Sequence, residues 1–440
     1  MNGDFMKRQK ILDFLATITL VFSVVSCTNN TDNKVGTENV TPNAQITPVA
    51  EKPTTLQTPE KLNTPQASEK PNTPQAYKEP LTPQASEKPV VSPEADPVKS
   101  AKLTNEAKFL AGMKVDGETP LASLQKTQTW KSHAAFFDDV WVRLEKQQLS
   151  KLRKWTDKEL TSINQSSEVI FYPFSGPDFL YGYSFFPKGS TYVLAGLEPV
   201  GSLPALEKSS AAKIDRSLEG IDQSLKALLQ WSFFRTNDMK VDLSEKGILP
   251  ILFVFLARTN NQILNVQYIG LEKDATPQVL EKGNKEKLIP GVKIDFVPQG
   301  ESQPRSLYYF SADLSDSALK KTPEFKKFVQ NLGKPVTYLK SASYLLHYGS
   351  FSTIRNLVLS QSVSVLQDDS GIPVKDFDRS KWNLRFYGNY TQPISLFQEE
   401  YQGDLKSIYQ NKTNVKPLSF GIGYRYKVND SNLMLAIRKK

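Results

Sequence analysis

The stretch Ile248-Leu-Pro-Ile-Leu-Phe-Val-Phe-Leu-Ala257 is an unbroken apolar run. A polar segment, Thr259-Asn-Asn-Gln262, follows it, and a second apolar segment runs from Ile263 to Leu271. Two apolar runs of strand length on either side of a polar turn are typical of a β-hairpin, and a run without alternating polar residues indicates a strand buried on both faces. We therefore expect a sheet in this part of the chain.

Further strands and helices are predicted around this hairpin, and they come in blocks. The other predicted strands are Glu168–Tyr172, Thr191–Leu194, Val292–Val297, Ser306–Phe310, Phe420–Val428 and Leu433–Ile437. The last four form two hairpins. Apolar residues at helical spacing predict helices over Pro120–Trp155, Ala211–Phe234 and Pro323–Leu332, the last ended by Gly333. Because strands and helices do not alternate strictly, residues 101–440 are expected to be an α+β domain with an antiparallel or mixed sheet, as one body or two intertwined lobes.

Composition excludes several classes of protein. The chain has 440 residues, of which 39% are hydrophobic, with one cysteine and two histidines. One cysteine cannot form an intramolecular disulfide framework, and so few Cys and His residues argue against a structural zinc site. No stretch reaches the ~18 consecutive apolar residues of a membrane-spanning helix, which excludes a polytopic membrane protein.

The N-terminus has the order of a secretory signal. Lys7, Arg8 and Lys10 form a basic cluster, the apolar segment Phe14–Ser26 follows, and Cys27 comes next. The end of this segment, Val24-Val-Ser-Cys27, resembles the lipobox of bacterial lipoproteins. An ordinary secretory signal with an incidental cysteine is the alternative.

The lipobox resemblance implies a lipid anchor at Cys27. In that family the signal peptide, here residues 1–26, is removed, the cysteine thiol is diacylated, and the new N-terminus is acylated, commonly with palmitate. Several acyl chains on one residue give durable membrane attachment. Thr28 follows Cys27, in place of the aspartate that retains many such proteins at the inner membrane. We therefore expect a bacterial cell-envelope location, at the outer membrane if the cell has one.

Residues 27–100 have the composition of a disordered linker. The segment Thr64–Pro71 recurs as Thr73–Pro80 and Thr82–Pro89, a nine-residue repeat rich in Thr, Pro, Gln and Lys. Such a segment buries too little apolar surface to offset the entropy of ordering. At ~3.1 Å per residue, an extended polyproline II tether of this length reaches roughly 200 Å. The segment is thus predicted to hold the folded domain away from its membrane.

The net charge of +9 favours anionic partners in general. The basic residues are scattered, however, and no nucleic-acid motif is present, so no specific nucleic-acid binding is expected.

Two segments are candidate sites, and the first is Phe171–Pro187, with eight aromatic residues broken by Gly and Pro. Aromatic residues in a loop often line a pocket. The binding candidates here are Tyr172, Phe174, Tyr181 and Tyr183, and the polar candidates for catalysis are Ser175 and Asp178. A packed aromatic corner is the structural alternative.

The second candidate segment runs from His347 through Asp368-Asp369 to Trp382 and Tyr387. Adjacent carboxylates serve as general acid and base or bind a cation, but Asp-Asp-Ser-Gly is also ordinary turn chemistry. The spacing does not fit a calcium loop, and the chain has no Gly-rich phosphate loop, dinucleotide fingerprint or His-Glu-x-x-His motif. No metal and no cofactor are therefore expected.

Three phrases resemble those of an uncharacterised family of bacterial envelope proteins. They are Tyr172-Pro-Phe-Ser-Gly-Pro-Asp-Phe-Leu-Tyr181, Leu197-Glu-Pro-Val-Gly201 and Gln367-Asp-Asp-Ser-Gly-Ile-Pro373. The resemblance implies no particular activity or partner.

The sequence leaves three functions open. The favoured one is a lipid-anchored binding or scaffold domain, held by Cys27 and reaching a cell-wall, glycan or protein partner. The second is an envelope hydrolase that uses some of Ser175, Asp178, His347, Asp368 and Asp369. The third is a structural subunit of an envelope complex, which would expose a large apolar patch.

Overall fold

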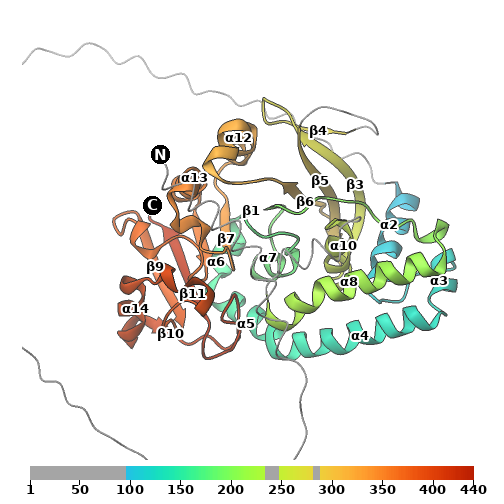
Figure 1. Cartoon of the computed structure of the whole chain (residues 1–440), viewed down its shortest axis with the longest axis horizontal. Coiled ribbons are helices and arrows are strands. Elements are labelled where there is room, and N and C mark those ends of the chain that lie inside the picture. The colour runs from blue at the N-terminus through green and yellow to red at the C-terminus, as the bar shows by residue number, and fades with distance from the viewer. Residues whose placement is uncertain (1–95, 233–246, 281–287) are drawn as a thin grey trace, which may run out of the picture. The chain divides into compact units, whose positions relative to one another are not determined.

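The computed structural model describes residues 96–232, 247–280 and 288–440 (Figure 1). The signal peptide, Cys27 and nearly all of the predicted tether lie outside these ranges. The described residues all belong to one compact unit.

A single mixed sheet runs through this unit. Its strand order is β10-β9-β11-β8-β7-β1-β2-β6-β5-β3-β4. The strands are β1 (Val169–Tyr172), β2 (Thr191–Gly196), β3 (Asn261–Leu271), β4 (Pro277–Val279), β5 (Ile289–Pro298), β6 (Arg305–Ser311), β7 (Val336–Leu339), β8 (Ser364–Gln367), β9 (Trp382–Gly388), β10 (Val415–Lys416) and β11 (Asn432–Arg438). The five central strands, β8-β7-β1-β2-β6, are mutually parallel, and β5, β3 and β11 run antiparallel to their neighbours. The expectation of an α+β fold with a mixed sheet is confirmed.

Helices cover both faces of the sheet. Alternate strand residues project to opposite faces: Ile170 and Tyr172 belong to one core cluster and Phe171 to the other. The first face is covered by α2 (Pro97–Leu110), α3 (Pro120–Leu124), α4 (Gln128–Leu144), α5 (Ser150–Glu159), α6 (Thr161–Ser166), α7 (Phe179–Phe185), α8 (Ala211–Trp231) and α10 (Leu249–Arg258). The second face is covered by α11 (Asp316–Lys321), α12 (Pro323–Asn331), α13 (Ser352–Gln361) and α14 (Gly403–Gln410).

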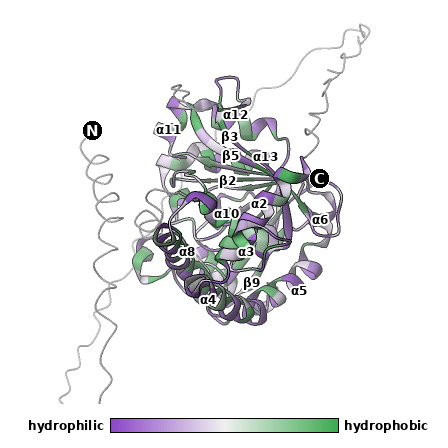
Figure 2. Ribbon diagram, turned by 90° about the vertical axis from the view of Figure 1, so that its right-hand side faces the viewer, coloured by the Kyte–Doolittle hydropathy of each residue, from purple (hydrophilic) through white to green (hydrophobic). Residues whose placement is uncertain are grey.

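The amphipathic helices follow the predictions. The region from Pro120 to Trp155 is helical, in several pieces, and among the described residues α8 and α12 match their predicted ranges to within one residue. Gly333, after α12, has φ +86°, as a helix C-cap requires. In Figure 2 the ribbon of α4 alternates between hydrophilic and hydrophobic residues, as expected for a helix with one face on the core.

The prediction of a buried strand over Ile248–Ala257 was wrong, because this run forms helix α10. Residues Leu249–Ala257 are all buried, and α10 contacts α2, α7, α8 and β3. A helix enclosed on all sides is apolar all round and shows no helical spacing. Pro250, in the first turn of the helix, was the signal against a central strand. Strand β3 pairs instead with β5 and β4.

The prediction of a C-terminal hairpin was also wrong for one of its two strands. Strand β11 exists, but both of its edges are occupied, by β8 and β9, so no edge remains for Phe420–Val428. That segment forms turns with an isolated bridge between Ile422 and Arg425.

Candidate functional site

The parallel part of the sheet contains a topological switch between β1 and β7. From β1 the chain passes through α7 to β2, whereas from β7 it passes through α13 to β8, in the opposite direction along the sheet. Crossovers of parallel strands are almost always right-handed, so opposite directions place their helices on opposite faces. Helix α7 indeed packs on the first face and α13 on the second. Ligands of open parallel sheets bind at the carboxyl ends of the strands beside such a switch.

Ionisable residues follow three adjacent strands at this edge. Asp178 lies between β1 and α7, Lys340 directly follows β7, and Asp368-Asp369 directly follow β8. All four are buried, with exposed fractions of 1%, 4%, 2% and 5%. The parallel strands thus bring together groups that lie up to 191 residues apart in the sequence, at the switch point.

Asp178 and Lys340 form a buried ion pair, with Lys340 Nζ 2.6 Å from Asp178 Oδ2. Asp178 caps α7 by accepting a bond from the Tyr181 backbone N–H (3.2 Å), and it accepts a second from the Tyr172 hydroxyl (2.8 Å). Lys340 also donates to the carbonyl of Ser232 and lies 3.9 Å from the centre of the Tyr181 ring. Burial raises the pKa of Asp178 and lowers that of Lys340, and each partner opposes the shift of the other.

Asp368 accepts hydrogen bonds that hold the ends of β7 and β8 together. Its carboxylate accepts from the backbone N–H of Ser341 (2.9 Å), from the N–H of Ser370 (3.0 Å) and from the Ser370 hydroxyl. The Asp-Asp-Ser-Gly segment forms a turn, as the interpretation of this segment as ordinary turn chemistry predicts. Burial, reinforced by the neighbouring carboxylate of Asp369, raises the pKa of Asp368 to about 7.

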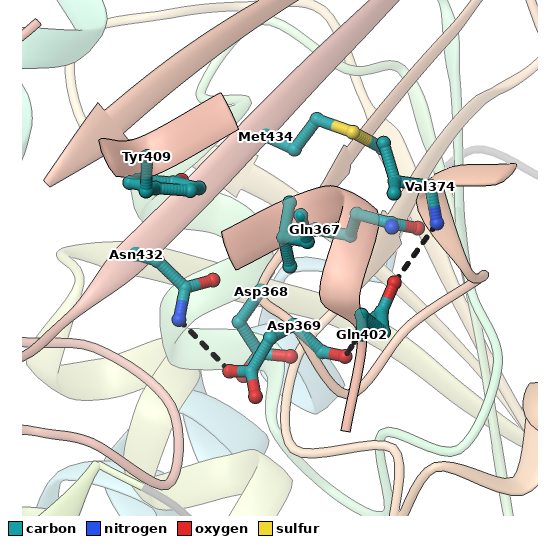
Figure 3. A pocket seen from close by; sticks show the side chains of 9 residues that line it. Gln367, Asp368, Asp369, Val374, Gln402, Tyr409, Asn432 and Met434 are labelled. Carbon is teal, nitrogen blue, oxygen red and sulfur yellow. Dashed lines mark hydrogen bonds between the residues drawn. The ribbon is translucent and has the colours of Figure 1, made fainter. Parts of the chain in front are cut away.

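Asp369 accepts from the Tyr344 hydroxyl and from the Asn432 side-chain amide (2.9 Å). Burial raises the pKa of Asp369, although these two bonds oppose the shift. In Figure 3 the Asn432 side chain points at this carboxylate. Both residues line a cavity of about 10 Å³, the size of one water molecule. Its lining residues are Gln367, Asp368, Asp369, Val374, Gln402, Leu405, Tyr409, Asn432 and Met434.

The backbone after β7 is strained. Ser341, Ser343 and Tyr344 have φ values of 50°, 51° and 53°, in the left-handed region that non-glycine residues rarely adopt. Such strain persists only where surrounding contacts impose it, and it concentrates at functional sites. Here the bonds from Ser341 to Asp368 and from Tyr344 to Asp369 impose it.

The C-terminal segment 420–431 closes over these charges. Gly423 lies so close that a β-carbon there would overlap Asp368 Oδ2. The Tyr424 hydroxyl donates to the Ser341 carbonyl (3.0 Å), and the Ser232 hydroxyl donates to the Gly423 carbonyl (3.2 Å). The switch crevice is therefore filled by the protein's own chain.

Outside this segment a cavity of about 670 Å³ opens between α4, α8 and the C-terminal segment. Helices α4 and α8 lie side by side there (Figure 1). The described lining residues are Phe136, Val140, Arg143, Leu144, Gln147, Gln148, Lys226, Leu229, Gln230, Ser232, Gly421, Tyr426, Lys427 and Val428. Its volume is within the ~300–1,000 Å³ of small-molecule sites.

A π-helical turn, Glu145–Leu149, shapes this cavity and joins α4 to α5. After Leu144, the next buried apolar residue is Leu149, five positions on, so Gln148 takes the place that a regular helix would give to a core residue. Gln148 accepts from the Tyr181 hydroxyl (2.6 Å) and donates to the Gly421 carbonyl. Ser232, which lines the cavity, thus contacts Lys340 of the buried ion pair directly, whereas Gln148 reaches the pair through Tyr181. π-Turns of this kind are frequent at functional sites.

Two of the five catalytic candidates lie outside the charge cluster. The hydroxyl of Ser175 donates to the carbonyl of Gly176 (2.9 Å). The Nδ1 atom of His347 is 3.1 Å from Glu400, and its ring meets the Tyr344 ring edge-on. Asp178 pairs with Lys340, the charge of Asp368 also acts on Lys340, and Asp369 is the next residue, but no bond joins Ser175 to His347.

The aromatic binding candidates pack mainly in the core. The prediction that their segment is a loop was wrong, because Phe179–Phe185 form α7. Tyr172, Tyr181 and Tyr387 have at most 1% of their surface exposed. Trp382 is buried under the Arg438 guanidinium, whereas Phe174 and Tyr183 are partly exposed.

Sequence reasoning missed Lys340 and the residues of the cavity. Nothing in the sequence distinguishes Lys340 from a surface lysine, since its partner lies 162 positions away. The π-turn did leave a signal, the five-residue step from Leu144 to Leu149 between otherwise helical spacings.

Comparisons with protein-family models, with curated proteins and with solved structures found no match. Within the described ranges, no group of three or more His, Cys, Asp or Glu side chains is arranged to hold a metal ion. None of the described helices has both the length and the apolar character needed to cross a membrane.

We expect Lys340→Met to lower the free energy of unfolding by about 3–5 kcal/mol, because it leaves the Asp178 carboxylate buried without its cation. Lys381→Met removes an exposed pair with Asp378 and should leave the free energy of unfolding nearly unchanged. Urea unfolding at pH 7 measures both. The double variant Asp178→Asn/Lys340→Met should recover part of the loss, and equal losses in the two lysine variants would contradict the assignment.

We expect Asp368 to make stability fall as the pH rises from about 4 to about 7. In this range the folded protein keeps a proton that the unfolded chain has lost, so ionisation costs up to about 1.4 kcal/mol per pH unit. Asp368→Asn cannot titrate, so this variant lacks the loss of stability. Between pH 5 and pH 8 the unfolding free energy of wild type should therefore fall relative to that of the variant. The exposed Asp404→Asn is the control, and a constant difference for Asp368→Asn would refute the prediction.

Proposed function

We propose that the chain is a lipid-anchored bacterial cell-envelope protein whose folded part is a binding domain. The lipobox resemblance at Cys27 supports the anchor, and the repeats of residues 27–100 support a tether that gives the domain reach. The ligand site proposed is the cavity between α4, α8 and the C-terminal segment.

The observation that carries this proposal is the chemistry of the cavity wall. It combines apolar side chains, amides and cations, and none of its described lining residues is Asp, Glu, His or Cys. A pocket of small-molecule size with a few polar groups is the usual form of a ligand site. A hydrolytic site would need a nucleophile and a general base facing the substrate. Asp, Glu, His and Cys supply most catalytic nucleophiles and bases.

A hydrolase is the second candidate, and the position of Asp368 favours it. Its pKa near 7 suits a general acid or base at neutral pH. Asp368 is only 2% exposed, however, beneath Gly423. Ser175 and His347 make separate contacts, so a Ser-His pair has less support than binding in the cavity.

The anchor is tested at Cys27. We expect Cys27→Ser to abolish metabolic labelling with palmitate and to leave the signal peptide attached, which gives a heavier chain on a denaturing gel. The neighbouring variant Thr28→Ser keeps the thiol and should be labelled like wild type. Undiminished labelling of Cys27→Ser would disprove the anchor at this residue.

The binding site is tested by filling the cavity. The mature chain, residues 27–440 with Cys27→Ser so that no detergent is needed, is mixed separately with the lipid and the glycan fractions of a bacterial envelope. Bound molecules are then quantified by mass spectrometry. We expect one component to be retained near one molecule per chain, and Gln230→Trp to reduce it at least about tenfold by occupying the cavity.

Gln223→Trp is the matched control, because Gln223 is exposed on the same helix but does not line the cavity. Equal retention by the two tryptophan variants, or retention from neither fraction, would overturn binding in this cavity.

A further inference from the structure

The cavity between α4 and α8 has an apolar floor and a cationic rim. Leu144 and Leu229, which line it, are 5% and 8% exposed, so they form its inner wall. Arg143, Lys226 and Lys427 also line it but are exposed, and the side chain of Arg143 is 58% exposed. The cations therefore surround the opening, and the leucines lie deeper.

The charge of the rim is of one sign. The Arg143 guanidinium forms an ion pair with Asp139 (Nη2 to Oδ2, 2.8 Å), and Asp139 does not line the cavity. Among the described residues, no ion pair joins Lys226 or Lys427 to a carboxylate. An anion at the opening would thus meet two ammonium groups and a partly neutralised guanidinium, with no described acidic side chain of the lining to repel it.

The inner wall would suit an aliphatic chain. Phe136, Val140 and Leu144 recur every four residues along one face of α4, and Leu229 faces them from α8. Burying an apolar chain against such a wall is favourable because it removes apolar surface from water. The amides of Gln147 and Gln230, both exposed at the opening, add hydrogen-bond donors beside the cations.

We propose that this cavity binds a single-chain anionic amphiphile, with its aliphatic chain against Leu144 and Leu229 and its carboxylate or phosphate head between Lys226 and Lys427. The inference rests on the proposed binding function and names its ligand class. A volume of about 670 Å³ suits one chain, and a glycan would leave the leucine wall without an apolar partner.

The test is titration calorimetry of the mature chain, residues 27–440 with Cys27→Ser, at ligand concentrations where the probes are monomeric. The probes are palmitate, hexadecyl phosphate, the neutral 1-hexadecanol and the chainless acetate. We expect palmitate or hexadecyl phosphate, whichever head the rim prefers, to bind at least about fivefold more tightly than hexadecanol, and acetate not to bind. The double variant Lys226→Glu/Lys427→Glu should weaken the anionic probe at least about tenfold, and rising salt should weaken it further.

Lys320→Glu/Lys326→Glu is the matched control, because it makes the same charge change on α11 and α12, which pack on the other face of the sheet. Equal affinity for hexadecanol and palmitate, or an equal effect of the two double variants, would overturn the anionic head. Suppose that no chain-bearing probe binds, but that the envelope fraction still yields a component that wild type retains and Gln230→Trp does not. This result would overturn the ligand class and leave the proposed function standing.

Discussion

The contact between Lys340 and Asp178 is the constraint on which this edge of the molecule depends. Two charges taken out of water are tolerated only when their geometry is good and their other hydrogen-bonding groups are satisfied. Here the pair fixes the start of α7 through Asp178, the end of β7 through Lys340 and the end of α8 through the Ser232 carbonyl. Three elements from distant parts of the sequence are thereby tied at one point.

The crevice at the topological switch is filled by the protein's own chain. The open cavity lies on the outer side of the segment that fills the crevice. Segment 420–431 covers Asp368, and its outer side faces α4 and α8. Gln148 and Ser232 belong to both layers, since each lines the cavity and contacts a group around the ion pair. An occupant of the cavity would therefore lie on a floor whose position is set by buried charges.

The sequence was informative where a residue's environment depends on its near neighbours. Helix α8 follows from its apolar spacing and α12 from its Gly333 cap, and β5 and β6 follow from local alternation and pair as a hairpin. Helix α10 could not be predicted in this way, because enclosure by four other elements removes the polar face that gives a helix its spacing.

The site was harder to predict for the same reason. Asp178, Asp368 and Asp369 were singled out as polar residues in turns, but their shared position depends on the order of parallel strands, in which Ile170 of β1 pairs with the distant Val336 of β7. The aromatic segment was read as a loop because of its Gly and Pro residues, yet Asp178 caps a helix within it. Long-range pairing decides the first outcome, and the local cap that Asp178 makes with the Tyr181 N–H decides the second.

The π-turn at Glu145–Leu149 also has a consequence for how this surface could arise. A single residue inserted into a continuous α-helix can be accommodated as one wide turn. Without the wide turn, the inserted residue would rotate every later residue by about 100° about the helix axis. Deleting one residue of this turn would return it to α-helical geometry with Leu149 four positions after Leu144, so Leu149 and Leu152 would keep their buried positions while the place of Gln148 at the cavity would be lost. The wall of the cavity is thus a trait that one insertion or deletion adds or removes while the packing of α5 is kept.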